Sequence, residues 1–181
     1  MNILNQYINQ IILMLILALA AWLGAQAKNL YRKYINNEIK QNVCRTVVRF
    51  VEQVYIDLLN RAKNYVHIMT PYLILDGQME SALCYAARRG VDVRIILPGI
   101  PDKKSAYCLA KTHFAALNAA GVKLYTYTPG FVHAKSFVAD GTEAVVGTIN
   151  LDYRSLYHHF ECAVYLHGSE AVADIERDFL T

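Results

Sequence analysis

The chain has 181 residues, enough for one domain of usual size and a shorter appendage. Its formal net charge is only +3, too small to indicate a nucleic-acid-binding protein. Its four cysteines include no C-x-x-C pair, so their spacing argues against a zinc site. Hydrophobic residues make up 55% of the chain, an excess over an average soluble domain, and much of this excess lies at the N-terminus.

The N-terminal segment carries no charged residue from Ile11 to Ala25. With Tyr7 and Ile8, the apolar stretch reaches about 19 positions, near the lower limit of roughly 17–25 residues for a transmembrane helix. We therefore predict a transmembrane anchor over residues 1–27.

Positive charges follow this segment at Lys28, Arg32 and Lys33. Because such residues are enriched on the cytoplasmic side of membranes, we expect a single-pass protein of the cell membrane with its catalytic part in the cytoplasm. A signal peptide is an alternative, since Ala25-Gln26-Ala27 resembles a cleavage site, but no positive region precedes the apolar core. A buried soluble helix is a weaker alternative, because the run is apolar on every face.

Residues 28–63 contain neither proline nor glycine, and their apolar residues recur at helical spacing. One face of the expected helix carries Val43, Val47, Val51, Val54 and Leu58. We predict a long amphipathic helix over residues 28–63. Its apolar stripe could pack on the following domain or against a second copy of itself.

The rest of the chain alternates short strands and helices. The expected strands cover residues 65–70, 91–97, 122–128, 134–139, 143–147 and 160–166. The expected helices run from an Asp76 cap to Arg89, over residues 103–120 and over residues 169–179, and Gly90 and Gly121 end the first two. Asp140-Gly141 predicts a tight turn between two strands. This alternation predicts an α/β domain whose sheet is covered by helices.

His133 and Lys135 stand two positions apart in a predicted strand, so both side chains are expected on one face. A single histidine on a strand is most often a satisfied core residue, but an imidazole beside an ammonium suits a bound anion. Gly147, Thr148 and Asn150 follow on a predicted turn and could supply backbone and amide donors to the same anion. An imidazole can attack phosphorus directly, so this set predicts phosphoryl transfer that requires no metal and no cofactor.

His133, Lys135 and Asp140 match the H-x-K-x4-D motif of the phospholipase D superfamily, which this segment resembles. The flanking sequences TPYL, GVDVRIILPGIPDK and VVGTINLDYRSLYHHFE look like the C-terminal half of bacterial cardiolipin synthases. The resemblance spans residues 55–180. It implies a single phospholipase D-like domain over residues 64–181, an α/β fold with a mixed sheet flanked by helices and one copy of the motif.

The resemblance also implies roles for the residues of the catalytic set. His133 would be the nucleophile of a phosphohistidine intermediate, or else its partner acid, and Asp140 would be mainly structural. Lys135 and Asn150, next to Gly147-Thr148, would bind the phosphate. Glu161 stands where the superfamily tends to carry an acidic residue that orients the catalytic histidine.

The implied reaction converts two phosphatidylglycerol molecules to cardiolipin and glycerol. Cardiolipin synthases carry two motifs, whereas this chain carries one, since His67, His113 and His167 lack a lysine two positions later. We therefore expect a homodimer that completes the active site. The expected partners are a phosphatidylglycerol-like phospholipid and the membrane, and no nucleic acid is expected.

Residues 1–55 resemble phage holins of the LL-H type, which have one span and a long cytoplasmic helix. Three functions are therefore open. The first is a membrane-anchored phosphatidyltransferase, and the second is a phosphodiesterase or nuclease that uses the same motif. The third is a holin-like membrane protein with an inactive C-terminal part.

Overall fold

A computed structural model describes residues 51–158 and 161–181. The predicted anchor over residues 1–27, and the part of the long helix before residue 51, lie outside the described residues. Within the described part, none of the helices combines the length and apolar character needed to cross a membrane.

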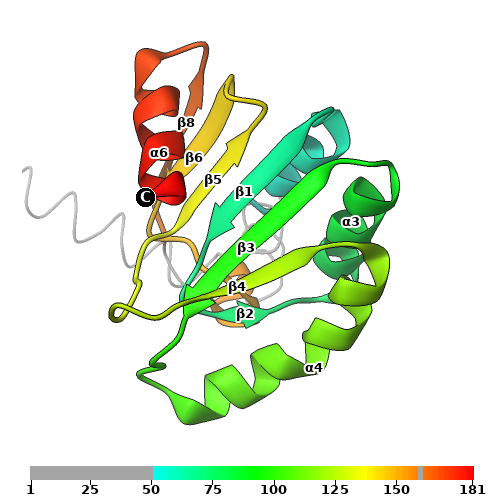
Figure 1. Cartoon of the computed structure of the whole chain (residues 1–181), viewed down its shortest axis with the longest axis vertical. Helices are drawn as coiled ribbons and strands as arrows, with labels where there is room; N and C mark the ends of the chain where they lie inside the picture. Colours follow the sequence, from blue (N-terminus) through cyan, green and yellow to red (C-terminus); the bar gives the residue numbers. More distant parts are fainter. Residues whose placement is uncertain (1–50, 159–160) are drawn as a thin grey trace, which may run out of the picture. The chain divides into compact units, whose positions relative to one another are not determined.

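The core of the domain is a six-stranded mixed sheet in the order β4-β3-β1-β5-β6-β8 (Figure 1). Three neighbouring strands are parallel, namely β1 (Tyr65–Met69), β3 (Asp92–Pro98) and β4 (Lys123–Tyr127). The other three are paired antiparallel, namely β5 (Ser136–Ala139), β6 (Glu143–Gly147) and β8 (Ala163–His167). The predicted mixed sheet is thus confirmed.

The two faces of the sheet carry different helices. α3 (Gly77–Arg88) and α4 (Lys104–Ala120) pack on one face, and α6 (Glu170–Leu180) packs on the other. Two adjacent residues of β5 show that the two faces have separate cores, because side chains of a strand alternate between faces. Phe137 belongs to the large core beneath α3 and α4, whereas Val138 packs against Val172 of α6.

Residues 51–61 form a helix that packs into the large core. Leu58 is fully buried there, and Val51 and Val54 pack against the same core. The described part of the predicted apolar stripe therefore packs on the α/β domain, which was the first of the two predicted alternatives. The helix over residues 51–61 shares its core with the strands and helices after residue 63. The expected boundary at residue 63 therefore does not divide this helix from the α/β domain.

The predicted caps and turn are confirmed at the ends of three elements. The Asp76 carboxylate accepts a hydrogen bond from the Met79 N–H at 2.8 Å and begins α3. Gly121 ends α4 with a φ of 99°. Asp140 and Gly141 both have positive φ, 52° and 66°, as the tight turn between β5 and β6 requires.

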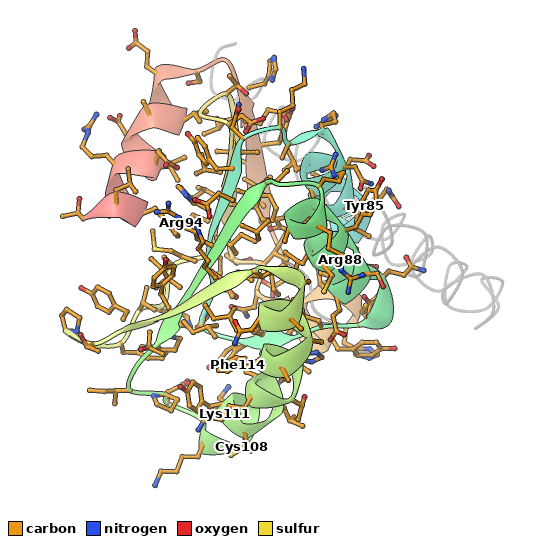
Figure 2. The ribbon with its side chains drawn as sticks, turned by 45° about the vertical axis from the view of Figure 1, so that its right-hand side comes forward. Tyr85, Arg88, Arg94, Cys108, Lys111 and Phe114 are labelled. Carbon is orange, nitrogen blue, oxygen red and sulfur yellow. The ribbon has the colours of Figure 1, made fainter. Side chains whose placement is uncertain are left out.

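α4 is amphipathic, as its sequence suggests. Cys108 and Lys111 lie on its exposed side, whereas Phe114 packs against the core (Figure 2).

Three short elements were not predicted. They are β2 (Leu73–Ile74), β7 (Leu151–Asp152) and α5 (Tyr153–Tyr157). β2 and β7 pair in parallel as a separate two-stranded sheet. Two-residue strands and a five-residue helix are too short to show a hydrophobic period, so the sequence pattern does not reveal them.

Candidate active site

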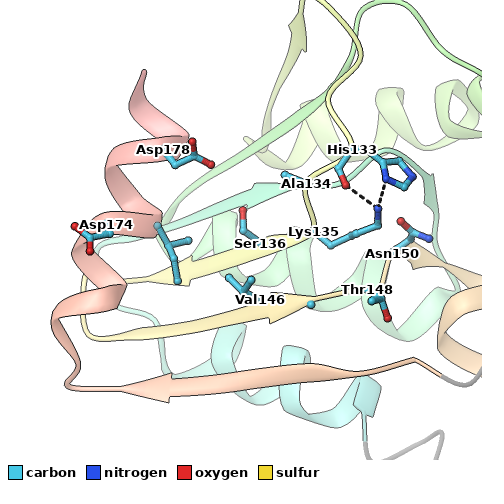
Figure 3. Close-up of a pocket in the computed structure, with 11 residues that line it drawn as sticks. His133, Ala134, Lys135, Ser136, Val146, Thr148, Asn150, Asp174 and Asp178 are labelled. Atoms are coloured by element: carbon cyan, nitrogen blue, oxygen red, sulfur yellow. Dashed lines mark hydrogen bonds between the residues drawn. The ribbon is translucent and has the colours of Figure 1, made fainter.

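His133 and Lys135 lie in the irregular segment just before β5, not within a strand as predicted. The ladder hydrogen bonds nevertheless continue past the strand, since the Gly147 N–H donates to the Lys135 backbone oxygen at 3.3 Å. The exposed imidazole of His133 and the half-buried side chain of Lys135 meet directly (Figure 3). The Lys135 Nζ atom lies 2.8 Å from His133 Nδ1 and 2.6 Å from the His133 backbone oxygen.

The Lys135 ammonium lies in a partly desolvated environment. Burial lowers the pKa of Lys135 below its ordinary value, and the nearby Glu161 carboxylate partly offsets this by raising it. A partly buried cation beside an exposed imidazole strengthens the attraction for an anion that reaches both groups.

A pocket of about 700 Å³ opens beside these two residues. Its volume lies within the usual range for small-ligand sites. His133, Lys135 and Asn150 form one side of this pocket, and Asp174 and Asp178 of α6 form the other (Figure 3). The structure therefore brings five of the predicted site residues to one cavity, these three together with Gly147 and Thr148.

Gly147 and Thr148 also line the pocket, but their backbone N–H groups are bonded within the chain. Gly147 donates to Lys135, and the Thr148 N–H donates to the Cys162 oxygen at 2.9 Å. A side chain at Gly147 would collide with the backbone of Cys162 and Ala163, so glycine is needed here for close strand packing. Phosphate binding by Gly147 and Thr148 stays a prediction, and in this structure their N–H groups already have partners.

A series of hydrogen bonds connects the side chains of Asn150, Ser155, Glu161 and Thr148. The Ser155 hydroxyl accepts a hydrogen bond from the Asn150 amide at 2.9 Å and donates to the Glu161 carboxylate at 3.1 Å. The Thr148 hydroxyl donates to the other oxygen of Glu161. Ser155 thus connects two predicted site residues, and its own side chain is 5% exposed.

Ser155 was not singled out from the sequence. α5 places it there, because the Asp152 carboxylate accepts from the Ser155 N–H at 2.6 Å and caps the helix. Asp152 is a residue type that commonly begins a helix, but no Glu or Gln stands three residues later to complete a capping box, so the sequence gives only a weak signal for this turn.

Asp140 lies beyond the opposite end of β5 from Lys135, about 16 Å away along extended chain at ~3.3 Å per residue. Its carboxylate accepts hydrogen bonds from the backbone N–H groups of Lys63, Asn64 and Tyr65 at 2.8, 2.8 and 2.9 Å. Burial raises the pKa of Asp140, but these hydrogen bonds outweigh it, so its pKa lies below the ordinary value. Although Asp140 was grouped with the catalytic residues, its contacts are those of a residue that ties β5 to the segment before β1.

Within the described residues, no group of three or more histidine, cysteine, aspartate or glutamate side chains is arranged to hold a metal ion.

Comparisons with known proteins match most of the chain to one family. The family described as "Cardiolipin synthase, PLD-like domain" matches residues 55–181. An uncharacterized protein of Streptococcus mutans is 67% identical over 128 residues, which cover 71% of this chain and 28% of that protein. A cardiolipin synthase of Geobacillus kaustophilus is 38% identical over 130 residues, 72% of this chain and 26% of the relative. The chain thus spans about a quarter of the length of these relatives.

Among solved structures, a phospholipase D family member, Nuc from Salmonella typhimurium, superposes with a TM-score of 0.61 at 20% identity. The match covers 71% of this chain and 84% of that one, and it concerns the fold. The matched residues include the whole constellation from His133 to Glu161, and the chain belongs to the cardiolipin synthase, phospholipase D-like domain family.

Proposed function

We propose that two copies of this chain form one phosphatidyltransferase site, which joins two phosphatidylglycerol molecules into cardiolipin and releases glycerol. The observation that carries the proposal is the contact between His133 and Lys135 at the wall of the 700 Å³ pocket. It pairs a nucleophile with a cation where a phosphodiester can reach both. The matched family and its cardiolipin synthase relatives support the lipid substrate.

In the first half of the reaction, an imidazole nitrogen of His133 attacks the phosphorus of one phosphatidylglycerol. A nitrogen–phosphorus bond forms, the bond from phosphorus to the glycerol oxygen breaks, and that oxygen takes a proton from the second histidine. Lys135 neutralises the charge that builds on the phosphoryl oxygens. Asn150, held by Ser155, is placed to add an amide hydrogen bond.

In the second half, a headgroup hydroxyl of another phosphatidylglycerol attacks the phosphohistidine. A new oxygen–phosphorus bond forms, and the nitrogen–phosphorus electron pair returns to the His133 ring. The hydroxyl proton passes to the second histidine, which is restored to its starting state.

The second histidine would be His133 of another copy, since the sequence carries one motif. A two-fold dimer presents the same patch from both copies, so it places two such imidazoles across one cavity. The predicted anchor over residues 1–27 would hold this cavity at the bilayer surface, on the cytoplasmic side, where the lipid substrate is concentrated.

The test is an assay of the full chain in vesicles of phosphatidylglycerol. We expect cardiolipin and free glycerol in equal amounts from the wild type and neither from His133→Ala. His167→Ala is the matched control, because His167 is exposed and does not line the 700 Å³ pocket. Equal product from wild type and His133→Ala would refute the proposal.

A further inference from the structure

A second pocket of about 430 Å³ lies on the other side of His133. His133 and Asn150 line both pockets, so together they form the wall between the two. We call the second one the basic pocket and define it by Tyr72, Ile74, Lys103, Tyr153, Arg154 and His158. Nothing in the proposed attack of His133 on its first substrate uses this cavity.

Two cations, Lys103 and Arg154, line the basic pocket from two separate segments. Lys103 precedes α4, whereas Arg154 and His158 come from α5 and its end. One carboxylate lines it, that of buried Asp152, which accepts a hydrogen bond from the Ser155 N–H, and the two cations outnumber this single negative charge. The pocket therefore favours an anionic ligand.

Tyr72 gives this pocket a fixed aromatic side. Its hydroxyl donates to the Asp102 carboxylate at 2.6 Å, and the Lys103 amino group lies 5.1 Å from the centre of its ring. The hydrogen bond and the cation–π contact together restrict both side chains. Ile74 and the ring of Tyr153 add apolar surface suited to the carbon atoms of an amphiphilic ligand.

The first pocket has the opposite character on the side away from His133. Asp174 and Asp178 of α6 line it, and Asp178 points from the helix toward the side that carries Lys135 (Figure 3). A second phosphodiester placed there would face carboxylates, whereas one placed in the basic pocket faces Lys103 and Arg154. The two sides of His133 thus differ in the charge that they accept.

We propose that the basic pocket binds the phosphodiester of the acceptor, so that the acceptor's headgroup hydroxyl points across Asn150 at His133. This inference rests on the proposed function, because a phosphatidylglycerol acceptor carries a phosphodiester one glycerol unit away from its attacking hydroxyl. The pocket selects an anionic glycerophosphodiester over a neutral alcohol or water. Lys103 is the specificity-determining residue that the structure offers for a direct test.

The first experiment measures binding without turnover. Soluble glycerophosphoglycerol is titrated into full-length protein in detergent, with uncharged diglycerol and inorganic phosphate as comparison ligands. We expect glycerophosphoglycerol to bind most tightly and Lys103→Gln to weaken it about tenfold, the effect of losing one charge-assisted contact to phosphate. Lys104→Gln is the matched control, since Lys104 is the exposed neighbour that lines neither pocket, and it should bind as the wild type does.

Equal binding of diglycerol, equal binding of inorganic phosphate, or equal losses in Lys103→Gln and Lys104→Gln would each overturn the assignment. Binding is independent of catalysis, so a chain that binds glycerophosphoglycerol but makes no cardiolipin would refute the proposed function and leave the pocket assignment standing.

The second experiment compares two acceptors in the active protein. Exchange of labelled glycerol into phosphatidylglycerol uses a neutral acceptor, whereas cardiolipin formation uses an anionic one. We expect Lys103→Gln to lower cardiolipin formation about tenfold more than glycerol exchange. Equal losses in the two reactions would place Lys103 in the donor site and contradict the inference.

Discussion

The Lys135 ammonium and the His133 ring are bonded to each other, with 2.8 Å between Nζ and Nδ1. An ammonium nitrogen can only donate, so Nδ1 is the acceptor and a neutral His133 ring carries its proton on Nε2. Lys135 is thus held on the imidazole. A phosphate that enters the pocket can take over this hydrogen bond, which frees Nδ1 and moves the positive charge to the reacting group.

The first prediction concerns the charge of Lys135. Lys135→Met should lower the rate of cardiolipin formation about 10²- to 10³-fold, the usual cost of removing one group that stabilises developing charge. The protein should stay folded, because the exchange removes no core contact. The measurement is the initial rate in phosphatidylglycerol vesicles beside the thermal unfolding temperature.

Lys111→Met is the matched control for this prediction, since Lys111 lies exposed on α4. It should keep wild-type rates. A Lys135→Met protein within threefold of the control would show that Lys135 has no part in the chemistry.

The second prediction concerns Ser155 as a positioning residue. Ser155→Ala removes the hydroxyl that links Asn150 to Glu161, so the Asn150 amide loses its acceptor while Glu161 keeps the hydrogen bond from Thr148. The loss should destabilise the domain by about 1–3 kcal/mol and also lower the maximal rate. The family resemblance implies that Glu161 orients the catalytic histidine, so the pH–rate profile should also shift, which a purely structural loss would not cause.

Ser81→Ala is the comparison for Ser155→Ala, since the Ser81 hydroxyl donates within α3 to the Gly77 oxygen. It should leave the pH–rate profile unchanged. If Ser155→Ala changes stability but leaves the rate and its pH dependence as they are, Ser155 serves the fold alone.

The third prediction concerns Asp140 and the stability of the domain. In Asp140→Asn, the new amide group would face a backbone N–H that now donates to a carboxylate oxygen. The variant should unfold about 1–3 kcal/mol more easily at neutral pH. Since Asp140 accepts bonds from residues far from the pocket, the variant that remains folded should keep most of its activity.

The pH dependence of this effect has a definite sign. The folded-state pKa of Asp140 lies below its ordinary value of 3.8, so its carboxylate stabilises the fold above that pH. The stabilisation is lost as pH falls through the lower, folded-state pKa. The difference between wild type and Asp140→Asn, measured by urea unfolding from pH 7 to pH 2, should therefore shrink at acid pH. A constant difference would contradict this account, and Asp57→Asn, which changes an exposed residue, is the control.

The elements with strong local signals could be predicted from the sequence. β1, β3 and β4 lie where strands were expected, and Asp76 and Gly121 cap the helices as expected. The strand predicted over residues 134–139 begins later in the structure, at Ser136. The Gly147 N–H still bonds to Lys135, one residue before the regular strand begins.

The supporting contacts of the site could not be predicted. Ser155 meets Asn150 and Glu161 only because α5 turns the chain back, and that helix is too short to show a period. Likewise, Lys103 and Arg154 stand far apart in the sequence and meet at one pocket through the tertiary fold. Motif spacing identifies the residues that do chemistry, whereas their partners depend on packing.

The most direct test of the central claim is the stoichiometry of a trapped intermediate. Full-length protein is mixed with phosphatidylglycerol labelled with ³²P, quenched in alkaline denaturant and digested, and the labelled peptide is identified. We predict an acid-labile label on His133, at one phosphoryl group per two chains, because one histidine of each shared site attacks while the other carries the proton. Absence of label on His133, or one label on every chain, would contradict a phosphohistidine site formed by two copies.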